Sequence, residues 1–98
     1  MEHLVLPSGF SPNEDGINDE FVILGIDRYP NNEIYIYNRW GDLVFSAKPY
    51  ENNWRGQNNN KTLLISGSNV VDGTYFYILI LNDEKNTKKN GFIELRRK

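Results

Sequence analysis

Short apolar runs alternate along the whole chain with clusters of glycine, asparagine, aspartate and proline. None of these runs keeps a 3.6-residue period over the ten or more residues that an amphipathic helix needs, so the pattern predicts an all-β protein. About seven strands in a chain of about 100 residues are typical of an antiparallel β-sandwich. The strands are expected near residues 3–7, 20–26, 33–38, 42–47, 61–66, 73–82 and 91–97.

The clearest hairpin signal is EIYIYNRWGDLVFSA, at residues 33–47. Ile34 and Ile36 alternate with Tyr35 and Tyr37, and Gly41 then supplies the turn chemistry. The two strands of this segment should be antiparallel neighbours.

The segment GTYFYILILN, at residues 73–82, is apolar at both its odd and its even positions. A strand of this kind is covered on both sides or lies in the middle of a sheet. One face is expected to carry Tyr75, Tyr77, Leu79 and Leu81, and the other Phe76, Ile78 and Ile80.

Length and composition indicate one folded domain with a modest core. The chain has 98 residues, of which 39% are hydrophobic and 13% aromatic, and no apolar stretch is long enough to span a bilayer. It has no cysteine, which excludes disulfides and thiolate zinc sites. Its start lacks the pattern of a secretory signal peptide, so an export address is expected elsewhere, or the chain is a fragment.

Charge is unevenly distributed along the chain. The net charge is -2, yet residues 84–98 carry 6 basic and 2 acidic side chains. The basic residues there are interleaved with Phe92, Ile93 and Leu95 at strand spacing. A solvated strand face is therefore favoured over a nucleic-acid patch, and no nucleic-acid partner is expected.

The stretch FSPNEDGINDEF, at residues 10–21, gathers oxygen ligands of the kind that calcium binds. It lacks the glutamate that closes a 12-residue EF-hand loop, and no helices flank it. The alternative is a turn whose Asn and Asp side chains cap their own backbone amides. The calcium hypothesis assigns Asn13, Asp15, Asn18 and Asp19 as ligands, and no other cofactor is expected.

The two tryptophans precede glycines closely and are expected to cover the ends of the core. For Trp40 we expect a largely buried ring, with Trp40→Ala costing about 3–5 kcal/mol. Trp54 lies in the polar stretch ENNWRGQNNNK, which reads as a surface loop anchored by the indole. Beside Asn52, Asn53 and Arg55, an exposed Trp54 would instead offer a platform for carbohydrate.

An enzyme is not expected. His3 is the single histidine, there is no cysteine nucleophile, and no serine has the context of a nucleophile elbow.

Five segments occur together and in order: FSPNEDGINDEF, IYIYNRWGDLVF, NNWRG, DGTYFYILIL and KNGFIELRRK. In this combination the chain resembles the gliding motility-associated C-terminal domain, the type B sorting domain of the type IX secretion system in Bacteroidetes. The resemblance covers nearly the whole chain. It departs from the family at Glu14, where a small residue is usual, and in the irregular run SGSNVV.

The resemblance implies an immunoglobulin-like β-sandwich at the C-terminal end of large exported proteins, often adhesins or surface enzymes. Residues 1–98 would form a single sorting domain, monomeric and non-catalytic. Its partners would be the cargo region N-terminal to it and the secretion machinery at the outer membrane. The cargo would pass through the periplasm to the cell surface or the medium. The alternative is an adhesive module that binds calcium or carbohydrate.

The closing segment GFIELRRK is expected to be both the last strand and the part of the export signal most exposed to a receptor. Phe92, Glu94 and Arg96 should share one face of it, and Ile93, Leu95 and Arg97 the other. The residues assigned to recognition are Gly91, Phe92, Arg96, Arg97 and Lys98. Those assigned to structure are Trp40, Gly41, Trp54, Gly56, Gly73 and Tyr75.

Overall fold

The fold is all-β and is seen here in a computed structural model that describes residues 4–11, 19–56 and 71–96. Within these ranges a 3-10 turn, η1 (Ile26–Arg28), is the one helical element, and no helix is long and apolar enough to cross a membrane. The strands are β1 (Gly9–Phe10), β2 (Glu33–Tyr37), β3 (Leu43–Ala47), β4 (Gly73–Ile80) and β5 (Lys88–Leu95).

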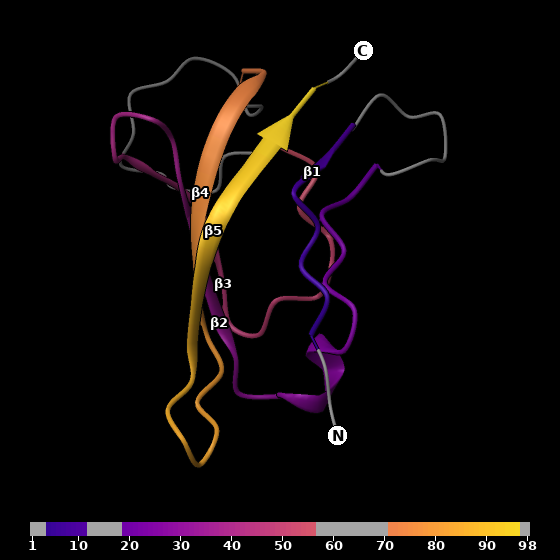
Figure 1. Cartoon of the computed structure of the whole chain (residues 1–98), viewed down its shortest axis with the longest axis vertical. Coiled ribbons are helices and arrows are strands. Elements are labelled where there is room, and N and C mark those ends of the chain that lie inside the picture. Colours follow the sequence, from indigo (N-terminus) through magenta and orange to yellow (C-terminus); the bar gives the residue numbers. More distant parts are fainter. Residues whose placement is uncertain (1–3, 12–18, 57–70, 97–98) are drawn as a thin grey trace.

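The strands form one mixed sheet in the order β1-β5-β4-β2-β3 (Figure 1). The predicted hairpin is confirmed, since β2 and β3 pair in antiparallel fashion with Ile34 opposite Ala47. The central position of β4 is confirmed as well, because it pairs with β2 on one side and with β5 on the other. β1 differs from the antiparallel expectation, since it runs parallel to β5.

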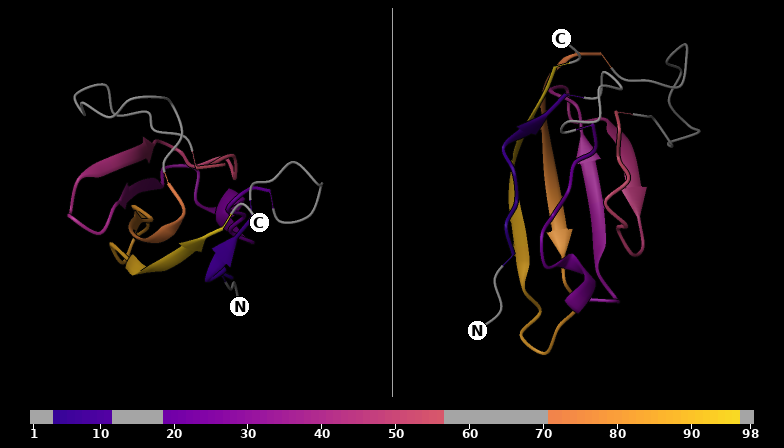
Figure 2. Two further views of the ribbon diagram at one scale, coloured as in Figure 1. Left: turned by 90° about the horizontal axis from the view of Figure 1, so that it is seen from above. Right: turned by 90° about the vertical axis from the view of Figure 1, so that its right-hand side faces the viewer.

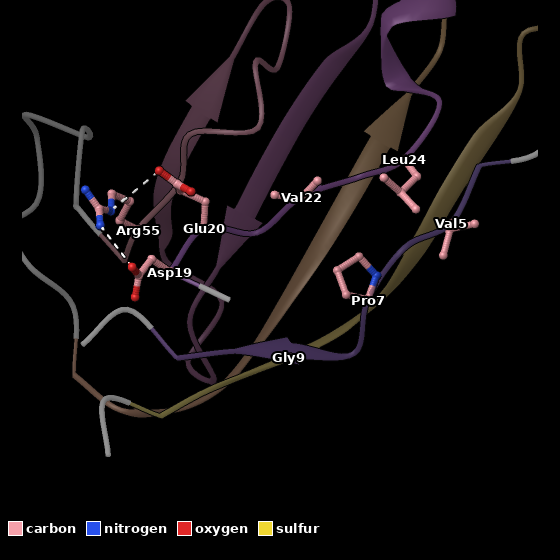
Figure 3. Close-up of a pocket in the computed structure, with 8 residues that line it drawn as sticks. All are labelled: Val5, Pro7, Gly9, Asp19, Glu20, Val22, Leu24 and Arg55. Carbon is pink, nitrogen blue, oxygen red and sulfur yellow. Dashed lines mark ion pairs between the residues drawn. The ribbon is translucent and has the colours of Figure 1, made fainter. Parts of the chain in front are cut away.

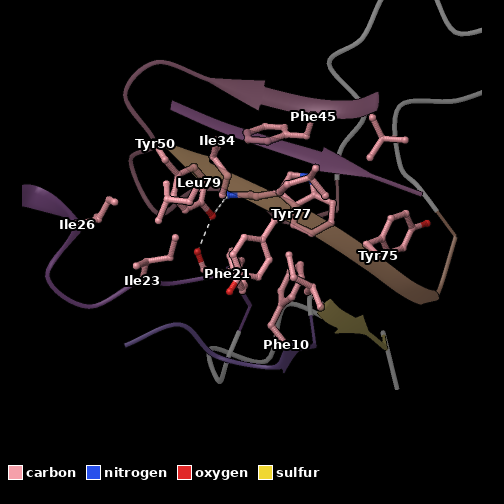
Figure 4. Close-up of a cluster of buried hydrophobic side chains, with 14 of the residues drawn as sticks. Phe10, Phe21, Ile23, Ile26, Ile34, Phe45, Tyr50, Tyr75, Tyr77 and Leu79 are labelled. Carbon is pink, nitrogen blue, oxygen red and sulfur yellow. Dashed lines mark hydrogen bonds between the residues drawn. The ribbon is translucent and has the colours of Figure 1, made fainter. Parts of the chain in front are cut away.

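Strand alternation places the core on one face of the sheet. Tyr75, Tyr77 and Leu79 of β4 are buried, whereas the residues between them are partly exposed. The segments at residues 4–8 and 19–26 lie across this face (Figure 2). Aromatic rings meet between the two layers (Figure 4). The fully buried hydrophobic side chains are Phe21, Ile23, Ile34, Ile36, Val44, Trp54, Leu79, Ile93 and Leu95.

The predicted seven-stranded sandwich is not confirmed. Two of its expected strands, at residues 3–7 and 20–26, meet in the described structure only through an isolated antiparallel bridge between Val5 and Leu24. Pro7 follows two residues later and has no N–H to continue the ladder. The strand expected at residues 61–66 lies outside the described residues.

β5 begins at Lys88, earlier than the predicted residue 91. The reason is the turn that joins it to β4. The carboxylate of Asp83 accepts hydrogen bonds from the backbone N–H and the hydroxyl of Thr87, both at 2.8 Å. The Leu81 N–H also donates to the Thr87 carbonyl at 3.0 Å. This closed turn lets the two strands pair up to Ile80 and Lys88.

Candidate functional site

The residues assigned to recognition lie on and just after β5, which pairs with β4 along one edge and with β1 along the other. The predicted alternation is confirmed for the described part of this strand. Ile93 and Leu95 are buried in the core, whereas Phe92 and Arg96 are exposed. β5 thus joins the core to an outer surface.

Phe92 is the end of an apolar row on the outer face of the sheet. It lies opposite Phe76 of β4, which in turn lies opposite Tyr37 of β2. The rings of Tyr37 and Phe76 are stacked, with centroids 5.2 Å apart and planes inclined by 17°. Phe92 itself remains 71% exposed. An aromatic side chain of this exposure, continuous with a stacked pair, is typical of a surface that a partner covers.

A shallow hollow of about 410 Å³ lies beside Phe92. The backbone groups of its lining residues belong to the β4–β5 ladder, so the hollow offers apolar and aromatic contact more than free hydrogen bonds. Asn90 adds an exposed amide at its rim. The lining residues are Phe76, Tyr77, Ile78, Asn90, Gly91 and Phe92.

Gly91 has a packing role on the opposite, core face. A Cβ atom at this position would lie 2.8 Å from the Tyr77 hydroxyl and 3.0 Å from the nearest ring carbon. Tyr77 is 6% exposed, and burial raises the pKa of its hydroxyl. Only glycine therefore lets the tyrosine ring lie directly on β5.

The positive charge at the end of β5 is partly compensated. Arg96 Nη2 lies 3.2 Å from Glu94 Oε2, and the Thr74 hydroxyl donates to Glu94 Oε1 at 2.8 Å. Both members of the ion pair are well exposed, so the pair contributes little to stability. Arg97 and Lys98 lie outside the described residues.

Of the four predicted calcium ligands, Asn13, Asp15 and Asn18 lie outside the described residues. Asp19 is 9% exposed, and its Oδ2 atom lies 3.7 Å from Arg55 Nη2. In the ranges that the structure covers, no three His, Cys, Asp or Glu side chains group as a metal site would require.

The predictions for the two tryptophans have opposite outcomes. Trp54 is completely buried, which excludes it as an exposed carbohydrate platform. The expected burial of Trp40 is wrong, because its ring is 69% exposed. Trp40 lies in the tight turn of the β2–β3 hairpin, where its backbone N–H donates to Asn38 Oδ1 at 3.0 Å. The turn projects the indole outward, and Arg39 lies over the ring at 4.4 Å from its centroid.

The other residues assigned to structure have the following positions. Gly41 and Gly56 have φ values of 85° and 88°, a region that glycine adopts without strain. Gly73 begins β4 with a φ of 151°. Tyr75 is buried, and its hydroxyl donates to the carbonyl of Val71 at 2.6 Å.

Sequence reasoning missed a buried polar network around Tyr50. The Tyr50 hydroxyl donates to the Phe21 carbonyl and accepts from the Trp54 N–H at 3.1 Å. Asn32, 2% exposed, accepts from the Tyr50 N–H at 2.9 Å. Asn52 Oδ1 accepts from the Ile23 N–H at 2.8 Å. The available signal was a tyrosine placed four residues before Trp54, immediately before a stretch interpreted as a surface loop.

Comparison with known protein families identifies a match that covers most of the chain. The family described as CHU_C Type IX secretion signal domain matches residues 4–95, which include all five strands of the sheet. Among curated proteins, no match was found.

Proposed function

The chain belongs to the CHU_C family of type IX secretion signal domains, and from this premise we propose that it directs the polypeptide that carries it through type IX secretion to the cell surface or the medium. The observation that carries the proposal is the length of the match, which spans residues 4–95 and so includes the core as well as the terminal strand. The cargo would be the region N-terminal to the domain in the same polypeptide.

We further propose that the domain acts by being recognised and not by catalysis. The exposed end of β5, with Phe92 and Arg96, supports this reading, because a partner could contact it without disturbing the core residues on the other face. Apolar contact would come from Phe92 and its hollow. The basic residues at the end would raise the rate of encounter with an acidic partner surface.

The experiment is an export assay. Residues 1–98 are fused to a fluorescent protein that carries a periplasm-directing signal peptide, in cells with a working type IX system. We expect fluorescence at the cell surface or in the medium, and periplasmic retention in a matched strain whose type IX translocon is deleted. Retention of the wild-type fusion in both strains would refute the sorting function.

The basic end is tested in the same fusion with a matched pair of triple variants. Arg96→Glu, Arg97→Glu and Lys98→Glu reverse three charges at the end of the chain. Lys85→Glu, Lys88→Glu and Lys89→Glu make the same change in net charge at the other end of the hairpin. We expect only the first set to reduce export while both keep the wild-type melting temperature, since exposed substitutions change stability by about 0.5 kcal/mol or less each.

The apolar contact is tested by Phe92→Ser against Val71→Ser. The two side chains are equally exposed, at 71% and 72%, but Val71 does not line the hollow beside Phe92 and instead borders a different hollow with Trp40. Reduced export for Phe92→Ser alone would support recognition at this face. Equal export of both would remove Phe92 from the recognition surface.

A second candidate function, carbohydrate-dependent adhesion, is supported by the exposure of Trp40. A sugar ring could stack on the indole in competition with Arg39, which lies over the ring. Titration of the tryptophan fluorescence with a panel of oligosaccharides tests this. A saturable change that Trp40→Ala abolishes is expected if the domain is adhesive, and an unchanged spectrum would leave sorting as the function.

A further inference from the structure

A second surface of the molecule has the features of a strand-binding groove. It lies between residues 4–9, which lead into and include the start of β1, and residues 19–24, which form part of the cover over the core. The two segments meet at Val5 and Leu24 and diverge toward Gly9 and Glu20 (Figure 3). The cavity between them measures about 410 Å³. Its lining residues are Val5, Pro7, Gly9, Asp19, Glu20, Val22, Leu24 and Arg55.

The groove opens because an antiparallel ladder stops after one step. The N–H groups of Val5 and Leu24 each donate to the other residue's carbonyl at 3.1 Å. The next pair of this ladder would be Pro7 and Val22, two residues further along each segment. Proline has no N–H to donate to Val22. The segments then separate, because β1 pairs with β5 instead.

Some backbone groups on the walls of the groove have no hydrogen-bond partner among the described residues. In the described part of the chain, the N–H and carbonyl of Val22 make no hydrogen bond. On the opposite wall, Glu94 N–H donates to the Ser8 carbonyl at 2.8 Å and Arg96 N–H to the Phe10 carbonyl at 3.2 Å. Because the C=O and N–H of one trans peptide group point in opposite directions and the Ser8 carbonyl points to β5, the Gly9 N–H faces away from β5 and toward the groove. Each wall thus presents backbone hydrogen-bonding groups toward the groove.

The side chains around these backbone groups are apolar. Of the six large hydrophobic residues that are exposed in the described ranges, three lie here: Val5, Val22 and Leu24, at 52%, 39% and 58%. Contiguous exposed apolar residues mark interaction sites more often than free surface. Backbone hydrogen-bonding groups flanked by apolar side chains fit an extended peptide, which supplies both hydrogen bonds and alternating side chains.

The wide end of the groove is acidic. Asp19 and Glu20 lie there, and Arg55 approaches them at 3.7 Å and 3.8 Å. These distances exceed those of direct charge-assisted hydrogen bonds. The carboxylates of Asp19 and Glu20 are acceptors of the kind that a basic side chain binds.

We propose that this groove binds an extended peptide segment of a protein partner, with alternating small apolar residues and a basic residue at one end, as an added strand between Gly9 and Val22. The inference rests on the proposed sorting function, in which the partner would be a component of the export route. The groove would be a contact site separate from the outer face of β5. Binding would extend the sheet beyond β1 and tie it to the segment that covers the core.

The first arm of the test is peptide binding to the isolated 98-residue chain, followed by nuclear magnetic resonance. The ligand is a capped peptide of sequence KVTVTK, which has a basic residue at both ends and therefore fits either strand direction. We expect it to shift the amide resonances of Val22 and Gly9 and to slow exchange of the Val22 N–H. The same peptide with N-methylated amides should not bind. The peptide EVTVTE should bind at least about tenfold more weakly than KVTVTK.

The second arm places Val22→Lys in the export fusion, with Val71→Lys as a control at an exposed valine that does not line the groove. Val22→Thr keeps the side-chain shape and serves as a control at the same position. We expect Val22→Lys alone to lose peptide binding and to reduce export about tenfold, with an unchanged melting temperature.

Three outcomes would overturn the inference: no shift at Val22 with KVTVTK, equal peptide binding by Val22→Lys and wild type, or wild-type export of Val22→Lys. If Val22→Lys loses export but KVTVTK shifts no resonance at Val22, the inference also fails. The surface would then be recognised without strand pairing. If the wild-type fusion itself is not exported, the sorting function fails, and the peptide arm still decides whether the groove binds a strand.

Discussion

At the scale of single residues, aromatic side chains divide into those that hold the two layers together and those that face outward. Trp54 lies at the centre of the first group, with ring centroids of Phe10, Phe45 and Tyr75 within 5.2–5.9 Å. Trp40 belongs to the second group, and Arg39 lies over its ring. The two indoles should therefore differ widely in their contribution to stability.

We expect Trp54→Ala to lower the free energy of unfolding by about 3–5 kcal/mol, since it removes a large aromatic side chain from the core. Trp40→Ala should lower it by less than about 1 kcal/mol. Urea denaturation of both variants, with Trp40→Phe and Trp54→Phe as conservative controls, measures the difference. Equal losses for the two alanine variants would contradict this assignment.

The hydroxyl of Tyr50 predicts a loss of stability at alkaline pH. Burial raises the pKa of this hydroxyl in the folded protein, so the unfolded chain releases the proton at lower pH than the folded one. The stabilisation is complete below the unfolded tyrosine pKa of about 10 and is lost as the pH rises above it. Melting temperatures should be level near neutral pH and fall above about pH 10.

Burial also raises the pKa of the Tyr77 hydroxyl, which adds to the loss of stability at alkaline pH. The control is therefore a comparison of variants. Tyr50→Phe should flatten part of the alkaline fall, although it lowers stability at neutral pH by leaving the Phe21 carbonyl without its donor. An alkaline fall that is identical in Tyr50→Phe and wild type would show that Tyr50 is not responsible.

At the scale of elements, the β4–β5 hairpin is the part of the fold on which the recognition face depends. Its turn is closed by Asp83 and Thr87, and hydrogen bonds from Thr87 lower the pKa of the Asp83 carboxyl. Its two strands hold Tyr77 against Gly91 on the core side and Phe92 beside Phe76 on the outer side. A change at either face of β5 can therefore alter the other through the backbone.

We predict that Gly91→Ala destabilises the domain by about 1–3 kcal/mol, because the new methyl group would overlap the tightly packed ring of Tyr77. The neighbouring exposed substitution Asn90→Ala should change stability by about 0.5 kcal/mol or less. Thermal denaturation distinguishes the two. In a Tyr77→Phe background the cost of Gly91→Ala should fall only in part, because the ring carbons remain within about 3 Å.

This result would change how export assays are interpreted. A Gly91 variant that is not exported would report a damaged fold and not a lost receptor contact. Phe92 and Arg96 are the cleaner positions for testing recognition, because both side chains are exposed. A Gly91→Ala variant with full stability would restore the direct recognition role for this glycine.

At the scale of the whole molecule, two separate surfaces are available to partners: the outer face around Phe92 and the groove around Val22. The two surfaces are on different elements of the fold. The domain could therefore bind one partner at the outer face and another at the groove. The calcium hypothesis concerns the segment before Asp19, which lies outside the described residues, and it remains a prediction.

If calcium binds there, millimolar calcium should raise the melting temperature by mass action. Asp15→Ala is the informative variant, since Asp19 also pairs with Arg55 and its removal would change stability with or without the ion. We expect Asp15→Ala to abolish the calcium-dependent increase. An unchanged wild-type melting curve in calcium would leave only the alternative interpretation of this segment as a turn.

What the sequence by itself determined is the local periodicity. The alternation along β2 and β5, the continuous apolar run of β4 and the turn chemistry around Gly41 were sufficient to predict an all-β chain, the β2–β3 hairpin and the buried positions of the closing strand. They were sufficient because side-chain direction in a strand repeats every two residues and is therefore written into neighbouring positions. The resemblance to a sorting domain rested on the same segments.

Only the tertiary structure decided the long-range relations. The parallel pairing of β1 with β5 joins residues that are far apart in sequence, and the close approach depends on Gly9, where a Cβ would lie 2.6 Å from the Glu94 carbonyl oxygen. Whether a tryptophan beside a glycine turns inward or outward depends on the layer that faces it, as Trp54 and Trp40 show. The groove at Val22 arises because Pro7 ends one ladder where β5 offers another, and this competition between distant partners has no local pattern.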